Sequence, residues 1–254
     1  MGKRLEGKRA LVTGGSRGIG AAIAEAYARE GARVVIASRK QPGVDQVAAE
    51  INAKYKDTVI PRACHVGHAD QVEGLIDFVF SELSGLDVLV NNAGTNPYFG
   101  PMLGISEELF DKTFQVNLKG VFEPTRFAAN KWSEKGEKGA IISIASIAGI
   151  QAAPLQGVYG MTKAAIISMT KTFAVELGTL GIRINAIAPG LIDTRLSAAL
   201  TGSPDIVKIF TDHTALKRYG QPEEIAEMAV YLGSDESSFV SGQTFCVDGG
   251  YTIT

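Results

Sequence analysis

Short runs of β-branched and aliphatic residues alternate with longer amphipathic stretches along the whole chain. Runs such as Val34–Ile36 and Val88–Val90 are continuously apolar, which is typical of parallel strands buried on both faces of a sheet. The pattern predicts strands at Arg9–Thr13, Arg33–Ala37, Thr58–Cys64, Asp87–Asn91, Ala140–Ile144, Arg183–Ala188 and Thr244–Val247. It predicts helices at Gly18–Glu30, Val44–Tyr55, Gln71–Leu83, Glu107–Lys135, Tyr159–Leu180 and Glu223–Leu232.

Strand–helix repetition of this kind implies right-handed βαβ crossovers and a seven-stranded parallel sheet flanked by helices. We therefore predict an α/β fold, with residues 1–254 forming a single doubly wound domain. The least regular segment is Asp193–Gly220, which follows the sixth predicted strand and contains Gly202 and Pro204. Because an insertion after the carboxyl end of a strand can cover a site, we expect a substrate lid at about residues 193–220.

Composition narrows the classes of function. The 25 Lys and Arg residues stand against 27 Asp and Glu, a formal net charge of −2, so no basic surplus favours a nucleic-acid partner. Cys64 and Cys246 are far apart and lack ligand spacing, which excludes a disulfide framework and favours the cytoplasm. Residues 139–162 are uncharged, but their glycines, glutamines and proline make a poor membrane span. We expect no membrane association and no metal site.

A glycine-rich loop follows the first predicted strand and opens the first helix. Glycines let the backbone turn tightly and approach a pyrophosphate, whose charge is stabilised by the free N–H groups of the helix N-terminus. This context predicts the dinucleotide site of a Rossmann fold, although a structural turn without a ligand is the alternative. The loop residues expected to bind the cofactor are Gly14, Ser16, Arg17, Gly18, Ile19 and Gly20.

The end of the second predicted strand bears on the choice of nucleotide. An NAD enzyme usually places a carboxylate there for the adenosine ribose, whereas this chain has Ser38 and Arg39 and no acid before Asp45. Arg39 can pair with a 2′-phosphate, Ser38 can donate to it, and Arg17 can close the other side. The pattern favours NADP(H) over NAD(H). The alternative is that Arg39 and Lys40 are solvated surface charges.

Candidate acid–base chemistry lies further along the chain. Tyr159 and Lys163 are four residues apart, so on a helix they share one face, and Ser146 lies 13 residues before Tyr159. Ser146 follows a predicted strand at the sheet edge where α/β folds bind ligands. A neighbouring ammonium and an oxidised nicotinamide favour a phenolate, so we expect the pKa of Tyr159 to be lowered toward neutrality.

Together these motifs resemble the short-chain dehydrogenase/reductase family over essentially the whole chain. The matching residues are Thr13–Gly20, Asn91–Gly94, Asn117, Ser146, Tyr159–Lys163 and Pro189–Gly190. Within the family, the chain is similar to NADP-dependent carbonyl and retinol reductases and to β-ketoacyl-carrier-protein reductases. The resemblance implies hydride transfer between a nicotinamide cofactor and a carbonyl or alcohol carbon.

The resemblance also assigns roles to residues. Tyr159 would be the general acid, Ser146 would hydrogen-bond the substrate oxygen, and Lys163 would hold the nicotinamide ribose. Asn117 would anchor a water in a proton path to Lys163. Further residues expected to line the cofactor are Asn92, Ala93, Gly94, Pro189, Gly190, Ile192 and Thr194.

One departure from the family pattern follows the third predicted strand. Where many relatives have an aspartate beside the adenine, this chain reads Cys64-His65-Val66-Gly67. His65 and Val66 are therefore expected at the adenine, where His65 would use a ring nitrogen or stack. The alternative for His65 is a partly exposed loop histidine without a ligand.

The substrate side is less informative. Ser146, Gln151 and Tyr159 are expected to contact the substrate, and aromatic and aliphatic neighbours favour a medium-sized, largely apolar carbonyl compound. Tyr98 and Phe99 either face this compound or pack against the lid. The last strand and the helix before it resemble a family tetramer interface, so a homo-oligomer is expected, although burial within one subunit explains the same residues equally well.

Two alternative functions remain. The first is an NAD-linked alcohol or hydroxysteroid dehydrogenase that runs oxidatively, which Arg39 disfavours. The second is a non-catalytic protein that senses NADP, which the complete set of Ser146, Tyr159 and Lys163 disfavours. The leading hypothesis is an NADP(H)-dependent oxidoreductase that reduces a ketone or aldehyde to an alcohol.

Overall fold

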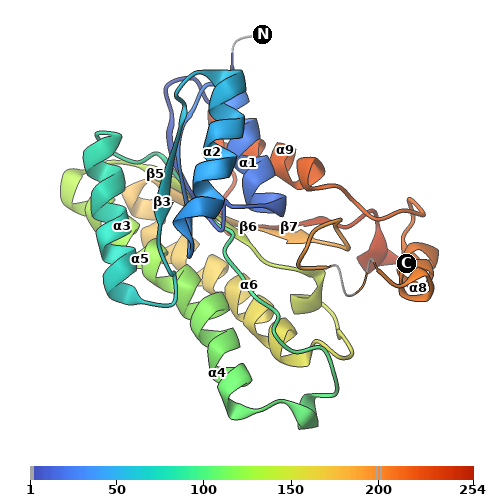
Figure 1. Cartoon of the computed structure of the whole chain (residues 1–254). Coiled ribbons are helices and arrows are strands. Elements are labelled where there is room, and N and C mark those ends of the chain that lie inside the picture. Colours follow the sequence, from blue (N-terminus) through green and yellow to red (C-terminus); the bar gives the residue numbers. More distant parts are fainter. Residues whose placement is uncertain (1–2, 198–199, 201) are drawn as a thin grey trace.

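The computed structural model describes residues 3–197, 200 and 202–254 (Figure 1). Within this part of the chain, seven parallel strands form one sheet in the order β3-β2-β1-β4-β5-β6-β7. The strands are β1 (Arg9–Thr13), β2 (Arg33–Ser38), β3 (Val59–Ala63), β4 (Val88–Asn91), β5 (Gly139–Ile144), β6 (Ile182–Pro189) and β7 (Thr244–Val247). The strand order reverses between β1 and β4, so the predicted doubly wound α/β fold is confirmed.

Helices cover both faces of the sheet, which explains the continuously apolar strands (Figure 1). Val12 and Val90 point into one buried core, whereas Leu11 and Leu89 point into another on the opposite face. The first core is closed by α1 (Gly18–Arg29), α2 (Gln41–Tyr55) and α9 (Pro222–Gly233). The second is closed by α3 (Ala69–Glu82), α5 (Gly120–Lys135) and the carboxyl-terminal part of α6 (Gly157–Leu177).

The prediction of one continuous helix over Glu107–Lys135 was wrong. The structure has α4 (Glu107–Phe114), a π-helical segment at Gln115–Lys119, and then α5. Pro124 lies inside α5 and cannot donate to the carbonyl of residue 120, four positions earlier. The wider π turn therefore ends where the hydrogen-bond ladder of the helix is already interrupted.

The segment expected to be irregular contains a helix. α8 (Pro204–His213) begins with a proline in its first turn, where the missing N–H has no intrahelical partner to lose. Pro204, one of the residues that made this segment look irregular in the sequence, starts the helix. Residues 198–199 and 201 of the expected lid lie outside the described residues.

The uncharged stretch at residues 139–162 forms β5, a short 3-10 turn and the start of α6. Within the described residues, no helix combines the length and the apolar character needed to cross a membrane.

Candidate active site

The predicted catalytic residues meet at the carboxyl edge of the central strands. Ser146 lies two residues after β5, while Tyr159 and Lys163 lie in the first two turns of α6. Asn117 comes from the π-helical segment. The structure thus gathers side chains from three separate elements where a doubly wound sheet binds its ligands.

The glycine loop is held against the end of β4 by hydrogen bonds between side chains and backbone. Asn92 Nδ2 donates to the carbonyls of Thr13 at 2.9 Å and Gly14 at 3.2 Å. Thr13 Oγ1 accepts the N–H groups of Asn92 at 3.1 Å and Ala93 at 3.2 Å. Gly14 has a φ of +70°, and a Cβ there would lie 2.7 Å from Asn92 Nδ2, so only glycine fits.

The same loop leaves a place for an anion at the start of α1. Arg17 occupies the N-cap position in extended conformation, and no side chain in the described part of the chain caps the helix. The first N–H groups of α1 are therefore available to a pyrophosphate. A Cβ on Gly18 would lie 3.3 Å from Thr194 Cγ2, so Thr194 lies beside the glycine loop, and its contact with the cofactor stays a prediction. These features fit a bound dinucleotide.

The end expected to hold the adenosine is rich in cationic side chains. Arg17 and Arg39 are exposed, and neither forms an ion pair with a carboxylate among the described residues. The Ser38 hydroxyl makes one long contact, 3.5 Å to the carbonyl of Lys40. A Cβ on Gly43 would lie 3.4 Å from Ser16 Cβ, so the start of α2 adjoins the glycine loop.

His65 is oriented by its own loop. Its Nδ1 accepts the N–H of Gly67 at 3.1 Å, so the neutral ring carries its proton on Nε2. Partial burial lowers the pKa of His65, and the charges of His68 and Arg39 lower this pKa further. His65 thus offers an N–H donor close to Arg39, while Val66 is buried against Gly120. Their contact with adenine stays a prediction.

Lys163 is a buried cation beside the candidate acid. Lys163 is 4% exposed as a residue. Its ammonium donates to the Ile144 carbonyl at 2.7 Å and lies 5.5 Å from the Tyr159 ring centroid. Burial lowers the pKa of Lys163 to about 8. An ammonium has three donors, so this one bond leaves others for ribose hydroxyls.

The pKa of Tyr159 moves in the direction opposite to the expectation. Burial raises this pKa to about 12, and a side-chain hydrogen bond with Ser146 offsets only part of the rise. The expected lowering included the charge of an oxidised nicotinamide; in the protein alone, removing the phenolate from water outweighs its stabilisation by neighbours. Tyr159 is consequently a protonated donor at neutral pH.

Ser146 and Asn117 are fixed by local hydrogen bonds. Ser146 Oγ accepts the N–H of Ala148 at 3.1 Å, which leaves the hydroxyl proton free to point elsewhere. Asn117 is fully buried, with its amide bonded to both backbone groups of Thr95 at 2.8 Å and to Thr162 Oγ1 at 3.2 Å. Its side chain therefore ties the loop after β4 to α6 instead of reaching Lys163 directly.

The residues that follow β6 pack against the residues that follow β7. A Cβ on Gly190 would lie 2.8 Å from Asp248 Cα, so the backbone after β6 packs against the end of β7. Pro189 is buried as the last residue of β6, and Ile192 is 5% exposed. Their contacts with the nicotinamide remain predictions. The cofactor contact of Gly94 is also a prediction; a Cβ added to Gly94 would lie 3.8 Å from Lys163 Nζ.

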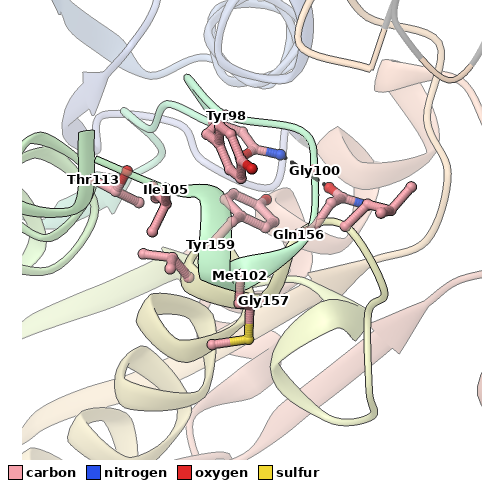
Figure 2. A pocket seen from close by; sticks show the side chains of 11 residues that line it. Tyr98, Gly100, Met102, Ile105, Thr113, Gln156, Gly157 and Tyr159 are labelled. Atoms are coloured by element: carbon pink, nitrogen blue, oxygen red, sulfur yellow. Dashed lines mark hydrogen bonds between the residues drawn. The ribbon is translucent and has the colours of Figure 1, made fainter. Parts of the chain in front are cut away.

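A pocket opens beside Tyr159 (Figure 2). Asn96 Nδ2 donates to Gln156 Oε1 at 3.0 Å across this pocket. The lining residues are Asn96, Tyr98, Gly100, Met102, Ile105, Thr113, Leu155, Gln156, Gly157, Val158 and Tyr159. The sequence analysis missed Met102, Ile105 and Thr113, because no local pattern marks a residue that reaches a pocket only after folding.

Two residues considered for the substrate side do not line this pocket. Gln151 is exposed and does not line this pocket, and its contact with the substrate stays a prediction. Phe99 is 40% exposed and also lies outside the lining, whereas its neighbour Tyr98 is part of it.

The fold and the site together define a nucleotide-dependent oxidoreductase. The sheet is doubly wound, a glycine loop lies at a helix N-terminus, and a serine, a tyrosine and a lysine lie at the same edge of the sheet. A family model described as "Enoyl-(Acyl carrier protein) reductase" matches residues 14–252. The chain belongs to the short-chain dehydrogenase/reductase family, whose members act on CH–OH or C=O groups with NAD(P).

Relatives and solved structures agree with this assignment. The chain is 39% identical to dehydrogenase/reductase SDR family member 4 of Caenorhabditis elegans, covering 98% of this chain and 96% of that protein. Identity to the Homo sapiens protein of the same name is 37%, over 97% and 88% of the two chains.

A short-chain type dehydrogenase/reductase from Mycobacterium marinum superposes with a TM-score of 0.93 at 38% identity, over 98% and 97% of the two chains. A gluconate 5-dehydrogenase from Burkholderia cenocepacia, solved in complex with NADP and tartrate, gives a TM-score of 0.94 at 33% identity. That match covers 99% of this chain and 97% of the other.

Proposed function

We propose that this protein is an NADP(H)-dependent reductase that converts a ketone or aldehyde into an alcohol. The observation that carries the cofactor preference is the end of β2, where an exposed, unneutralised Arg39 stands in place of a carboxylate. Arg17 and Ser16 on the adjoining loop add donors for a 2′-phosphate. The NADP bound by the similar Burkholderia cenocepacia dehydrogenase supports this preference.

In the proposed mechanism, the hydride for the substrate carbonyl carbon would come from NADPH when it is bound. Tyr159, whose pKa burial raises to about 12, is protonated at neutral pH and donates its phenol proton to the carbonyl oxygen. Ser146 directs its hydroxyl proton at the same oxygen and stabilises the negative charge that develops there. Lys163, charged below about pH 8, holds ribose hydroxyls and favours the tyrosinate left after proton transfer.

The pocket beside Tyr159 supports the proposed substrate class. Met102, Ile105, Leu155 and Val158 contribute aliphatic or thioether surface, which fits a medium-sized, largely apolar carbonyl compound. An oxidative NAD-linked dehydrogenase is the alternative, and the missing carboxylate after β2 speaks against it.

We also propose that the protein is a homotetramer in the cytoplasm. β7 is an edge strand, and nearby Phe239 exposes its whole side chain, which a second copy of the chain would cover. The free thiols of Cys64 and Cys246 suit a reducing compartment. Sedimentation analysis of the purified protein tests the assembly.

Titration with NADPH and NADH, followed by the fluorescence of the single tryptophan Trp132 and of the nucleotide, tests the cofactor. Turnover on the same sample is then measured with a panel of ketones and aldehydes. Tight NADPH binding with carbonyl reduction supports the proposal. A large preference for NADH contradicts it, and tight binding without any turnover favours the NADP-sensing alternative.

Replacing Arg39 with aspartate is expected to weaken NADPH binding by about 1–3 kcal/mol, or roughly 5- to 150-fold, through the loss of a charge-assisted contact. NADH lacks the 2′-phosphate and should bind unchanged or better. Lys40→Asp, which makes the same charge change at the neighbouring exposed residue, serves as control and should have a much smaller effect. Equal weakening of both nucleotides by Arg39→Asp would show that Arg39 does not contact the phosphate.

A further inference from the structure

Helix α8 lacks the buried face that normally holds a helix in place. None of its ten residues is buried, and Ile209 is 60% exposed. An isolated helix of this length is marginal in water, so its position depends on the few tertiary contacts it makes. Two places hold the insertion that carries α8, and only the second of them contacts the helix itself.

The first place is the base of the insertion that carries α8. Ile192 and Gly220 form a parallel bridge, with the N–H of Asp193 bonded to the Gly220 carbonyl at 2.9 Å and the N–H of Gly220 bonded to the Leu191 carbonyl at 2.9 Å. This bridge joins the two ends of the insertion but does not touch α8 itself. This bridge alone would not fix the position of α8.

The second place is the C-terminal segment, which we define as Asp248–Thr254 and which lies beside α8 in Figure 1. The Tyr251 ring stacks on Phe210 at 5.2 Å between centroids and meets the edge of His213 at 6.2 Å. Thr254 Oγ1 donates to the His213 carbonyl. Just after the helix, the N–H of Leu216 donates to the Gly249 carbonyl at 3.1 Å.

The C-terminal segment is itself held rigid by Asp248. One carboxylate oxygen accepts the N–H of Gly250 at 2.9 Å, and the other accepts the N–H and hydroxyl of Thr252 at 2.9 and 2.7 Å. The backbone of Asp248 also packs against Gly190, in the loop proposed to line the nicotinamide. The same short segment therefore contacts both that loop and α8.

We infer that the C-terminal segment positions α8 relative to the active site, with the Tyr251–Phe210 stack as its main contact, and that Tyr251 is a positioning residue for substrate binding. Tyr251 acts through α8 and touches neither the substrate nor the cofactor. Its loss should increase the substrate KM more than it lowers kcat, because the catalytic side chains on α6 are anchored elsewhere. The kinetic part rests on the proposed function, whereas the anchoring of α8 does not.

The test compares Tyr251→Ala, Tyr251→Phe and Ile253→Ala in the full-length protein. Ile253 shares the short turn with Tyr251 but is 85% exposed, so Ile253→Ala is the matched control. Limited trypsin digestion, followed by mass spectrometry, measures cleavage after Lys208 inside α8. Tyr251→Ala should accelerate this cleavage by up to about tenfold, the value of one aromatic pair, and Tyr251→Phe should restore the wild-type rate.

The kinetic experiment measures KM and kcat for a ketone or aldehyde that the wild-type protein reduces. Tyr251→Ala should raise KM by several-fold with kcat nearly unchanged, and Tyr251→Phe should behave as wild type. The inference is overturned if cleavage after Lys208 is equally fast in Tyr251→Ala and Ile253→Ala, or if cleavage accelerates throughout the chain through global unfolding. Absence of carbonyl turnover in the wild type would contradict the proposed function and leave the digestion result standing.

Discussion

Replacing Tyr159 with phenylalanine is expected to lower carbonyl turnover at least ~10²-fold, because the variant loses the proton donor to the developing alkoxide. The burial that raises the pKa of this phenol to about 12 keeps the proton on Tyr159 across the neutral range. NADPH affinity should stay close to that of wild type, since the ring remains and Lys163 keeps its bond to the Ile144 carbonyl.

The measurement pairs NADPH fluorescence titration with single-turnover and steady-state kinetics. Tyr55→Phe removes a phenol hydroxyl at the end of α2, outside the site, and controls for a general effect of the substitution. Retained nucleotide binding with lost turnover identifies Tyr159 as the acid and rejects the non-catalytic sensor. Undiminished turnover would remove Tyr159 from the mechanism.

Replacing Lys163 with methionine is expected to abolish most turnover and at the same time to stabilise the fold at neutral pH. Burial lowers the pKa of Lys163 from 10.5 to about 8, so the folded state binds this proton less tightly than the unfolded chain. Each pKa unit corresponds to about 1.4 kcal/mol, which gives a burial penalty of about 3 kcal/mol. Losing the hydrogen bond to Ile144 offsets about 1 kcal/mol of the gain.

The sign of the pH dependence follows from the lowered pKa. Below about pH 8 the lysine is charged in both states and the full penalty applies. Between about pH 8 and 10.5 the folded state has lost the proton while the unfolded chain retains it, so wild-type stability recovers as pH rises. The stabilising effect of Lys163→Met should therefore be largest below pH 8 and shrink as the pH rises toward 10.5.

Urea denaturation from pH 7 to 10 checks this expectation, with Lys171→Met as the control. Lys171 lies on the same helix but is exposed, and its replacement should change the free energy of unfolding by less than about 0.5 kcal/mol. A Lys163→Met protein that is less stable than wild type at pH 7 would show that the buried ammonium is stabilised by more than its single recorded hydrogen bond.

Much of the fold followed from local pattern. The strand predictions fall within one or two residues of the observed bounds, because an apolar run buried on both faces has few alternatives in an α/β chain. The errors occurred where a local rule was overridden. Pro204 starts a helix, and the π segment at Gln115–Lys119 interrupts an otherwise regular helical pattern. Both outcomes have a local cause, because a proline is tolerated in the first turn of a helix and Pro124 interrupts the hydrogen-bond ladder beside the π turn.

The sequence by itself determined the doubly wound fold, the glycine loop before α1, the missing carboxylate after β2, and the family with its serine, tyrosine and lysine. These features depend on residue type and short-range spacing, which act before any distant contact forms. Only the tertiary structure decided the direction of the Tyr159 pKa, the lining of the pocket by Met102 and Ile105, and the stacking of Tyr251 on Phe210. Burial and contact between segments far apart in the chain arise from packing, and no local pattern encodes them.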